Sequence, residues 1–360
     1  MVQEDRVLYM FLELAQTSHR SGEEQLLAQR IVTRLRTLGL KAHIDKAGNV
    51  IASLPGQGEP ILLSAHLDSV DPCTGVAPVL DGGIIRSDGR TVLGADDLSG
   101  VVAILEALQV VTEGKIAHRP VEVSLTVEEE TGLNGSKNLN YGELRARMGV
   151  ALDASGPFGA IVVAAPSHNM LSATVLGKAA HAGVAPENGI SAIRIAAEAI
   201  AKMPLGRIDS ETTANIGIIR GGIATNIIPD KVEIEGEARS RDERKLRQQS
   251  LAMTEALEQT AKRLGGEAKV QVERAYNGFV LTEDDEIVRL AMKAIEAVGV
   301  TPRLEASGGG SDINIYNAHG IACTNLSTGM MHAHTTEEWI AVADLVNAAR
   351  TVLELIRVDH

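Results

Sequence analysis

Hydrophobic and polar positions follow two different periods in the first part of the chain. Apolar residues recur three or four positions apart, as in helices with one buried face, over residues 5–16, 21–39 and 98–111. Shorter stretches are continuously apolar or alternate at every second position, as strands do, over residues 49–54, 60–67, 121–127 and 148–154. Strands that alternate with helices predict an α/β sheet covered by helices on both faces.

The pattern changes after about residue 166. A strand, a helix, two alternating strands, a long charged helix and a further strand follow in that order up to residue 276. The α/β pattern then resumes with a helix at 285–299, a strand at 321–327 and a final helix at 337–358. We therefore predict a catalytic domain formed by residues 1–166 and 276–360, with an α+β domain, residues 167–275, inserted into it.

Two helix starts carry the spacing of a capping box, in which a hydroxyl side chain and a Glu three positions later satisfy the first amides of a helix. Ser21 with Glu24 has this spacing, and so has Thr335 with Glu338. We expect both pairs to cap the helices that follow.

Composition narrows the class of protein. The chain has 360 residues, of which 44% are hydrophobic and only 2% aromatic, so its core must be aliphatic. Its net charge of −13 disfavours binding to nucleic acid or to an anionic membrane. Two cysteines make no disulfide framework, and the acidic N-terminal stretch is no secretory signal, so we expect a cytoplasmic protein.

Polar residues that can bind metal follow the predicted strands. His66 and Asp68 end one apolar strand, three adjacent carboxylates from Glu128 to Glu130 end another, and Asp153 ends a third. Each of these motifs alone is typical of an ordinary loop or a solvated turn. In an open α/β sheet, however, the carboxyl ends of the strands border one crevice, so these side chains are expected to meet there.

Two further motifs complete the set. Asp96 and Asp97 lie in a turn that enters a helix, where an Asp is also a common cap. His332 and His334 lie in the loop before the last helix. Together the motifs supply what two Zn²⁺ ions need: a histidine and a terminal carboxylate for each ion, a bridging carboxylate, and a free carboxylate to move protons.

At this point the sequence resembles the zinc-dependent exopeptidases and deacylases that include peptidase T, carboxypeptidase G, succinyl-diaminopimelate desuccinylase and aminoacylase. The resemblance covers essentially the whole chain through motifs in a fixed order: SAHLDSV, GADDLSG, EEETG, ALDASG, GKAAHAG, GEARSRD, GGGSD and HTTEEW. LSAHLDSV, LGADD and GGGSD are most similar to the peptidase T branch.

The resemblance implies a role for each matched residue. One zinc ion would be held by His66, Asp96 and Asp153, and the other by Asp96, Glu130 and His334. Glu129 would be the general base and acid, and Asp68 would orient His66. The resemblance also implies a cis peptide bond between Asp96 and Asp97.

For the inserted domain, the resemblance implies a lid that also joins two subunits into a homodimer. His181 would polarise the scissile carbonyl, and Arg239, Asn226 and Gly309 would contact the substrate. Taken alone, these four residues are equally typical of surface loops, a strand end and a flexible glycine segment. Leu98 stands where many relatives carry Lys, and the chain is shorter than peptidase T, so the length of the preferred peptide stays open.

The leading interpretation is a di-zinc aminopeptidase that hydrolyses short peptides with a metal-bound hydroxide and Glu129 as base. An N-acyl-amino-acid amidohydrolase (deacylase) or a carboxypeptidase would use the same mechanism, and Mn²⁺ or Co²⁺ suits the same ligands as Zn²⁺. A non-catalytic relative would lack a ligand or the base, and this sequence has them all. The GGGSD segment lacks the lysine of a nucleotide-binding P-loop.

Overall fold

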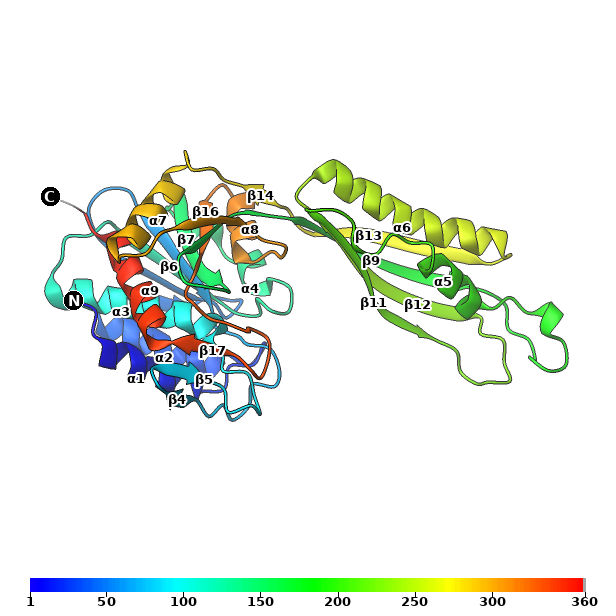
Figure 1. The fold of residues 1–360 in the computed structure, drawn as a ribbon, viewed down its shortest axis with the longest axis horizontal. Coiled ribbons are helices and arrows are strands. Elements are labelled where there is room, and N and C mark those ends of the chain that lie inside the picture. Colours follow the sequence, from blue (N-terminus) through cyan, green and yellow to red (C-terminus); the bar gives the residue numbers. More distant parts are fainter. Residues whose placement is uncertain (359–360) are drawn as a thin grey trace. The chain divides into compact units, whose positions relative to one another are not determined.

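The computed structural model describes residues 1–358 and divides into two compact units. The first unit consists of Met1–Val163, Val280–Ala306 and Ser311–His360, and the second of Ala164–Phe279 and Ser307–Gly310 (Figure 1). The second unit thus extends a few residues beyond the predicted 167–275 at both ends. It also includes part of the glycine-rich segment, because Gly310 packs directly against the ring of Tyr276.

A mixed sheet forms the centre of the first unit, as predicted. Its main strands are ordered β1-β2-β6-β3-β7-β16-β8, with the short strands β14 and β15 both paired with β8. Their bounds are Lys41–Ile44 (β1), Val50–Leu54 (β2), Ile61–His66 (β3), Val121–Thr126 (β6), Met148–Ala154 (β7), Ala160–Ala165 (β8), Phe279–Val280 (β14), Arg303–Ala306 (β15) and Ala322–Ser327 (β16).

The four central strands β6, β3, β7 and β16 run parallel to one another. Their carboxyl ends therefore lie along one edge of the sheet. A separate small sheet is ordered β17-β5-β4, with bounds Trp339–Ala341 (β17), Ile84–Arg86 (β5) and Val79–Asp81 (β4).

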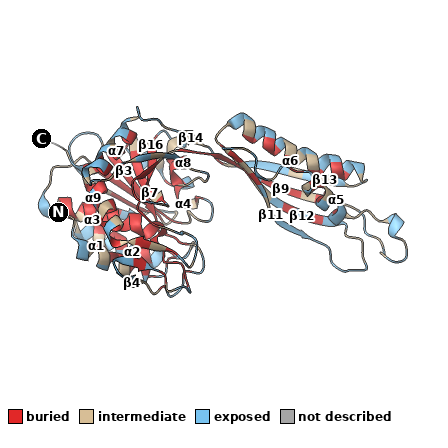
Figure 2. Cartoon of the chain, in the orientation of Figure 1, coloured by how far each residue is buried: buried red, intermediate tan, exposed pale blue. Residues whose placement is uncertain are grey.

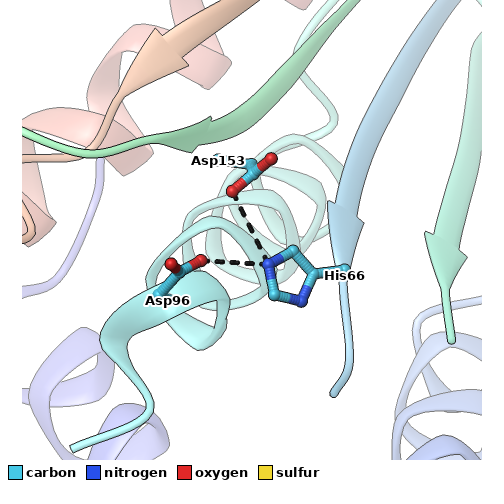
Figure 3. Close-up of side chains that lie close together, drawn as sticks. All are labelled: His66, Asp96 and Asp153. Carbon is cyan, nitrogen blue, oxygen red and sulfur yellow. Dashed lines mark hydrogen bonds and ion pairs between the residues drawn. The ribbon is translucent and has the colours of Figure 1, made fainter. Parts of the chain in front are cut away.

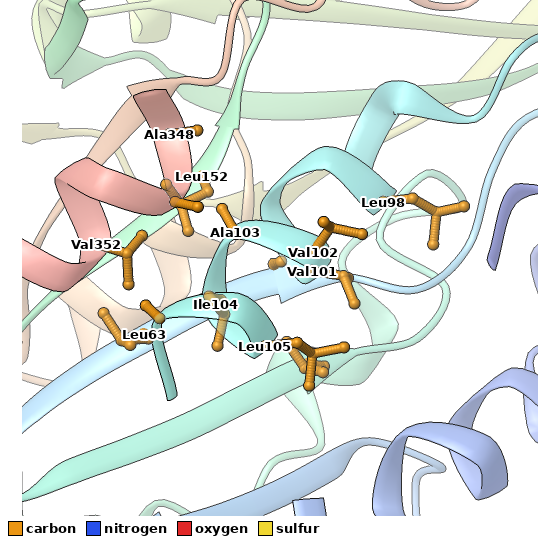
Figure 4. Packing of buried hydrophobic residues seen from close by; sticks show 14 of the residues in the cluster. Leu63, Leu98, Val101, Val102, Ala103, Ile104, Leu105, Leu152, Ala348 and Val352 are labelled. Carbon is orange, nitrogen blue, oxygen red and sulfur yellow. The ribbon is translucent and has the colours of Figure 1, made fainter. Parts of the chain in front are cut away.

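The helix α3 (Ala95–Gly114) is the centre of the core. Its side chains are buried on nearly every side, because it packs on β3 and β7 and also against two other helices, α1 (Glu4–Ala15) and α9 (Val342–Ile356) (Figures 2 and 4). The contacts are aliphatic: Leu63 and Leu152 from the sheet and Val352 from α9 lie around Ile104 and its neighbours (Figure 4). The remaining helices of this unit are α2 (Gln25–Thr37), α4 (Asn134–Lys137), α7 (Glu286–Ala297) and α8 (Asp312–Ala318).

Both predicted capping boxes are wrong. α2 begins at Gln25 without a side-chain cap, because Ser21 and Glu24 bind groups elsewhere in the fold. The last helix begins at Val342, later than predicted, because Trp339–Ala341 pairs with β5 as a strand. Glu338 is buried before that strand and caps no helix.

The second unit is a five-stranded antiparallel sheet with two helices, α5 (Ala192–Ile200) and α6 (Glu243–Arg263), packed on it. The strand order is β10-β11-β12-β9-β13. The bounds are Ser167–Leu176 (β9), Gly206–Arg207 (β10), Thr212–Gly221 (β11), Lys231–Ser240 (β12) and Glu267–Tyr276 (β13). It has its own aliphatic core, and no described helix of either unit is long and apolar enough to cross a membrane.

An ion pair within the core of the first unit allows a test of the fold. The Glu106 carboxylate on α3 is fully buried, and Arg6 of α1 binds it with Nε at 2.5 Å and Nη2 at 2.8 Å. Arg6→Met leaves a buried charge unpaired and should lower the free energy of unfolding by about 3–5 kcal/mol, measured by chemical denaturation. The double variant Arg6→Met/Glu106→Met should recover most of the loss. Equal stability of Arg6→Met and the wild type would contradict this account of the core.

Candidate metal centre

His66 is the last residue of β3, and its ring faces two carboxylates. The Nε2 atom lies 3.0 Å from Oδ1 of Asp96 and 3.6 Å from Oδ1 of Asp153 (Figure 3). The Nδ1 atom lies 2.9 Å from the backbone carbonyl of Asp68 and 3.4 Å from its carboxylate. A neutral ring therefore donates from Nδ1 and presents the lone pair of Nε2 to the space between Asp96 and Asp153.

A second group lies on the other side of Asp96. The Nε2 atom of His334 lies 2.7 Å from Oε1 of Glu130 and 3.2 Å from Oδ2 of Asp96. Asp96 thus points one oxygen toward His66 and the other toward His334. A carboxylate with one oxygen in each of two donor groups is the arrangement that a bridged pair of cations requires.

Glu129 belongs to neither of these two groups, yet it lies at the same place. With His66 and Glu130 it forms a third possible donor group, whose ligand atoms lie within 4.8 Å of one another. Burial, reinforced by the nearby charge of Asp153, raises the pKa of Glu129 well above its usual value. A carboxyl group that is buried and left out of both donor groups can hold and release a proton at this centre.

The electrostatics of the centre fit bound cations. Burial raises the pKa of Asp153 to about 7, and hydrogen bonds to Asp96 and Glu130 raise the pKa of His334 to about 10. Burial disfavours the charged form of His66, yet the carboxylates of Asp153, Asp68 and Asp96 raise its pKa well above the usual value. Protons thus neutralise this nitrogen and oxygen donor set, and divalent cations can replace them.

The turn that carries Asp96 is held by a residue whose contribution the sequence analysis missed. The buried carboxylate of Glu338 accepts three backbone amides: Leu93 at 2.7 Å, Gly94 at 2.8 Å and Asp96 at 2.9 Å. Glu338 follows His334 by four residues, and this spacing within HTTEEW was the available signal. It ties the loop of His334 to the turn of the shared carboxylate.

Asp97 contributes in a different way. The peptide bond between Asp96 and Asp97 is cis, as the family resemblance implied. The Asp97 carboxylate accepts the amides of His66 and Gly100, both at 3.1 Å. Asp97 therefore fixes the end of β3 to the start of α3 and leaves metal binding to Asp96.

Comparison with known proteins agrees with this geometry. The model described as the peptidase dimerisation domain matches residues 167–264, and that of peptidase family M28 matches residues 49–191. A crystal structure of aminopeptidase PepT from Bacillus cereus is 44% identical, covers 99% of this chain and 98% of that one, and has a TM-score of 0.90. The chain belongs to the peptidase T-like family of metallopeptidases.

Two further proteins are similar to this chain over nearly its whole length. A tripeptidase from Staphylococcus aureus is 41% identical over 99% of this chain and 98% of that one, with a TM-score of 0.94. The uncharacterised protein YqjE of Bacillus subtilis is 43% identical over 99% of each chain. The family and the α/β fold with an inserted domain, both expected from the sequence, are thus confirmed.

The four residues for which the resemblance implied substrate contacts all belong to the second unit. His181 and Asn226 lie on neighbouring exposed loops, joined by a bond from the Ala182 amide to the Asn226 carbonyl at 2.9 Å. Arg239 is partly buried beside Gly309. Their roles toward a substrate stay predictions.

The two neighbouring histidines provide a matched pair for testing the second donor group. Both side chains are about half exposed, but Nε2 of His334 lies 2.7 Å from Glu130 and 3.2 Å from Asp96, whereas His332 pairs with the exposed Glu337 at 3.7 Å. Because both residues have positive φ angles, Asn is the suitable replacement. His334→Asn should lower the bound metal to about one ion per subunit, measured by elemental analysis, and His332→Asn should not. Equal metal content of the two variants would contradict the assignment of His334.

Metal binding should also release protons. Because the pKa of His334 in the metal-free protein is about 10, the ring is protonated at pH 7 and must lose its proton to become a ligand. Calorimetric titration of metal-free protein with Zn²⁺ at pH 7, in buffers of different ionisation enthalpy, should show release of at least about one proton. Apparent affinity should rise with pH. A binding enthalpy independent of the buffer would contradict this picture.

Proposed function

We propose that this protein is an aminopeptidase with two metal ions per subunit that cleaves short peptides, tripeptides above all. The observation that carries the proposal is Asp96, whose two oxygens belong to the donor groups of His66 and His334. The similarity to the B. cereus aminopeptidase and the S. aureus tripeptidase, which extends over nearly the whole chain, supports the choice of substrate class.

Zn²⁺ is the proposed metal. The donors are imidazole nitrogens and carboxylate oxygens, which suit Zn²⁺ and also Mn²⁺ or Co²⁺. We assign one ion to His66, Asp96 and Asp153 and the other to Asp96, Glu130 and His334. When bound, the pair would polarise the attacking water and the scissile carbonyl.

Two side chains of the protein would carry out the other steps: proton transfer and orientation of a metal ligand. Glu129 would take a proton from the attacking water and deliver it to the amine that leaves, a role that suits its buried position and raised pKa. Asp68 would keep the Nε2 lone pair of His66 directed at the centre, through the contact of its carbonyl with Nδ1.

The second unit would supply the substrate contacts and the dimer. Glu237 binds Nε and Nη2 of Arg239 at 3.1 and 2.9 Å, which leaves Nη1 beside Gly309 for a substrate carboxylate or carbonyl. His181 and Asn226 would contact the substrate near the scissile bond. The match to the peptidase dimerisation domain supports assembly as a homodimer through residues 167–275. The buried free thiols of Cys73 and Cys323 suit the cytoplasm as the location.

A substrate panel tests the function. Metal-loaded protein should cleave tripeptides with a free amino terminus, with a kcat/KM at least about 100-fold higher than for their N-acetylated forms. N-acyl amino acids should be poorer still. Glu129→Gln should lower kcat about 10²- to 10⁴-fold, because the proton carrier is lost.

Two controls make the outcome decisive. Elemental analysis should find the same metal content in Glu129→Gln as in the wild type, which separates loss of the base from loss of the ions. Faster hydrolysis of N-acyl amino acids than of tripeptides would show a deacylase instead. Equal hydrolysis by wild type and Glu129→Gln would remove the proposed base.

A further inference from the structure

Residues 127–130 form the turn that contains Glu129 and Glu130. Each of their four backbone amides donates a hydrogen bond to a side-chain oxygen from elsewhere in the first unit. The bonds run from Val127 N to Asn49 Oδ1 at 3.1 Å, Glu128 N to Glu24 Oε1 at 3.1 Å, Glu129 N to Asp68 Oδ1 at 2.9 Å, and Glu130 N to Asp68 Oδ2 at 3.2 Å. We call Asn49, Glu24 and Asp68 the amide cradle.

The segment held by the amide cradle is irregular backbone. β6 has ended at Thr126, and Glu128 has a φ of 50°, a region that non-glycine residues seldom occupy. The side chain of Glu130 must point into the donor group of His334, and that of Glu129 must point elsewhere. The backbone path of residues 127–130 determines both directions. Contacts from outside the segment are therefore needed to select that path.

Of the three cradle residues, Glu24 is the one whose side chain binds backbone amides and no side chain among the described hydrogen bonds. Asn49 also binds Asp45 and Gly135, and Asp68 also contacts His66. The carboxylate of Glu24 accepts two amides, Gly22 at 2.9 Å and Glu128 at 3.1 Å, and the residue is only 4% exposed. A buried carboxyl group is costly without hydrogen-bond partners, and these two backbone amides are the partners that the structure gives to Glu24.

The loop before α2 reaches the same segment by a second route. Ser21 Oγ donates to Oδ2 of Asp68 at 2.7 Å, the oxygen that also accepts the Glu130 amide. The two residues whose spacing had predicted a helix cap thus both support the turn of Glu129 and Glu130, one directly and one through Asp68.

We propose that Glu24 is a positioning residue for Glu129: it holds the Glu128 amide so that the base stays aimed at the metal centre. The inference depends on the proposed role of Glu129 as the base. It requires an acceptor oxygen at this position, because a single atom, Oε1, accepts both amides. We expect a neutral amide oxygen to serve as well as a carboxylate oxygen.

Three variants separate the acceptor from the charge. Glu24→Gln keeps a carbonyl oxygen in the place of Oε1 and removes the charge, whereas Glu24→Met has a similar size and no acceptor. Glu23→Gln is the matched control, since the Glu23 side chain is 59% exposed and makes a long ion pair with Arg20, at 3.8 Å. If Glu24→Met fails to fold, Glu24→Asp, whose carboxylate is one methylene short of the Glu128 amide, takes its place.

Two measurements test whether Glu24 holds the turn of residues 127–130: hydrogen exchange and steady-state kinetics. In metal-free protein, hydrogen exchange of the peptide spanning residues 127–132 should be faster by about tenfold or more in Glu24→Met and unchanged in Glu24→Gln and Glu23→Gln. With metal and a tripeptide, Glu24→Met should lower kcat about 10-fold or more, with KM and metal content close to wild type. Glu24→Gln should stay within about twofold of the wild type in kcat.

The outcomes are distinguishable. Wild-type exchange and kcat in Glu24→Met would overturn the proposal, and so would a loss in Glu24→Gln as large as in Glu24→Met. If the wild type cleaves no tripeptide, the proposed function fails, while the exchange measurement still decides whether Glu24 holds the turn.

Discussion

The structure depends on one electrostatic constraint: several carboxylates are buried together around Asp96. Like charges at such short range are unfavourable unless cations or protons lie between them. In the metal-free protein, protons reduce this repulsion. The pKa values of the His66 and His334 rings are raised, and so are those of the Glu129 and Asp153 carboxyl groups. The same crowding would attract a pair of divalent cations and leave Glu129 as the carboxyl group that handles protons.

The rest of the first unit serves to keep these groups in place. The parallel strands β3, β6, β7 and β16 bring His66, the turn of Glu129, Asp153 and the loop of His334 to one edge of the sheet. The exact path of each loop is then set by buried carboxylates that accept backbone amides. Glu338 does this at the Asp96 turn, and Glu24 and Asp68 do it at the Glu129 turn.

Sequence patterns could predict the strands, the edge at which they end and the donor residues, since these follow from hydrophobic period and from the order of the motifs. The preference for His334 over His332 came from the family motif, and the structure places His334 next to Glu130 and Asp96. The bonds that Ser21 and Glu24 make could not be predicted, and the spacing of Glu338 from His334 was a signal that did not reveal which backbone amides it binds. Local spacing is typical of a helix cap, whereas their partners lie far away in the sequence and become neighbours only in the folded chain.

The central claim is that two cations share Asp96, and anomalous X-ray scattering from crystals grown with Zn²⁺ tests it most directly. Data collected above and below the zinc absorption edge should show two peaks per subunit. One should lie among His66, Asp96 and Asp153, and the other among Asp96, Glu130 and His334. A single peak, or peaks that Asp96 does not join, would contradict the account.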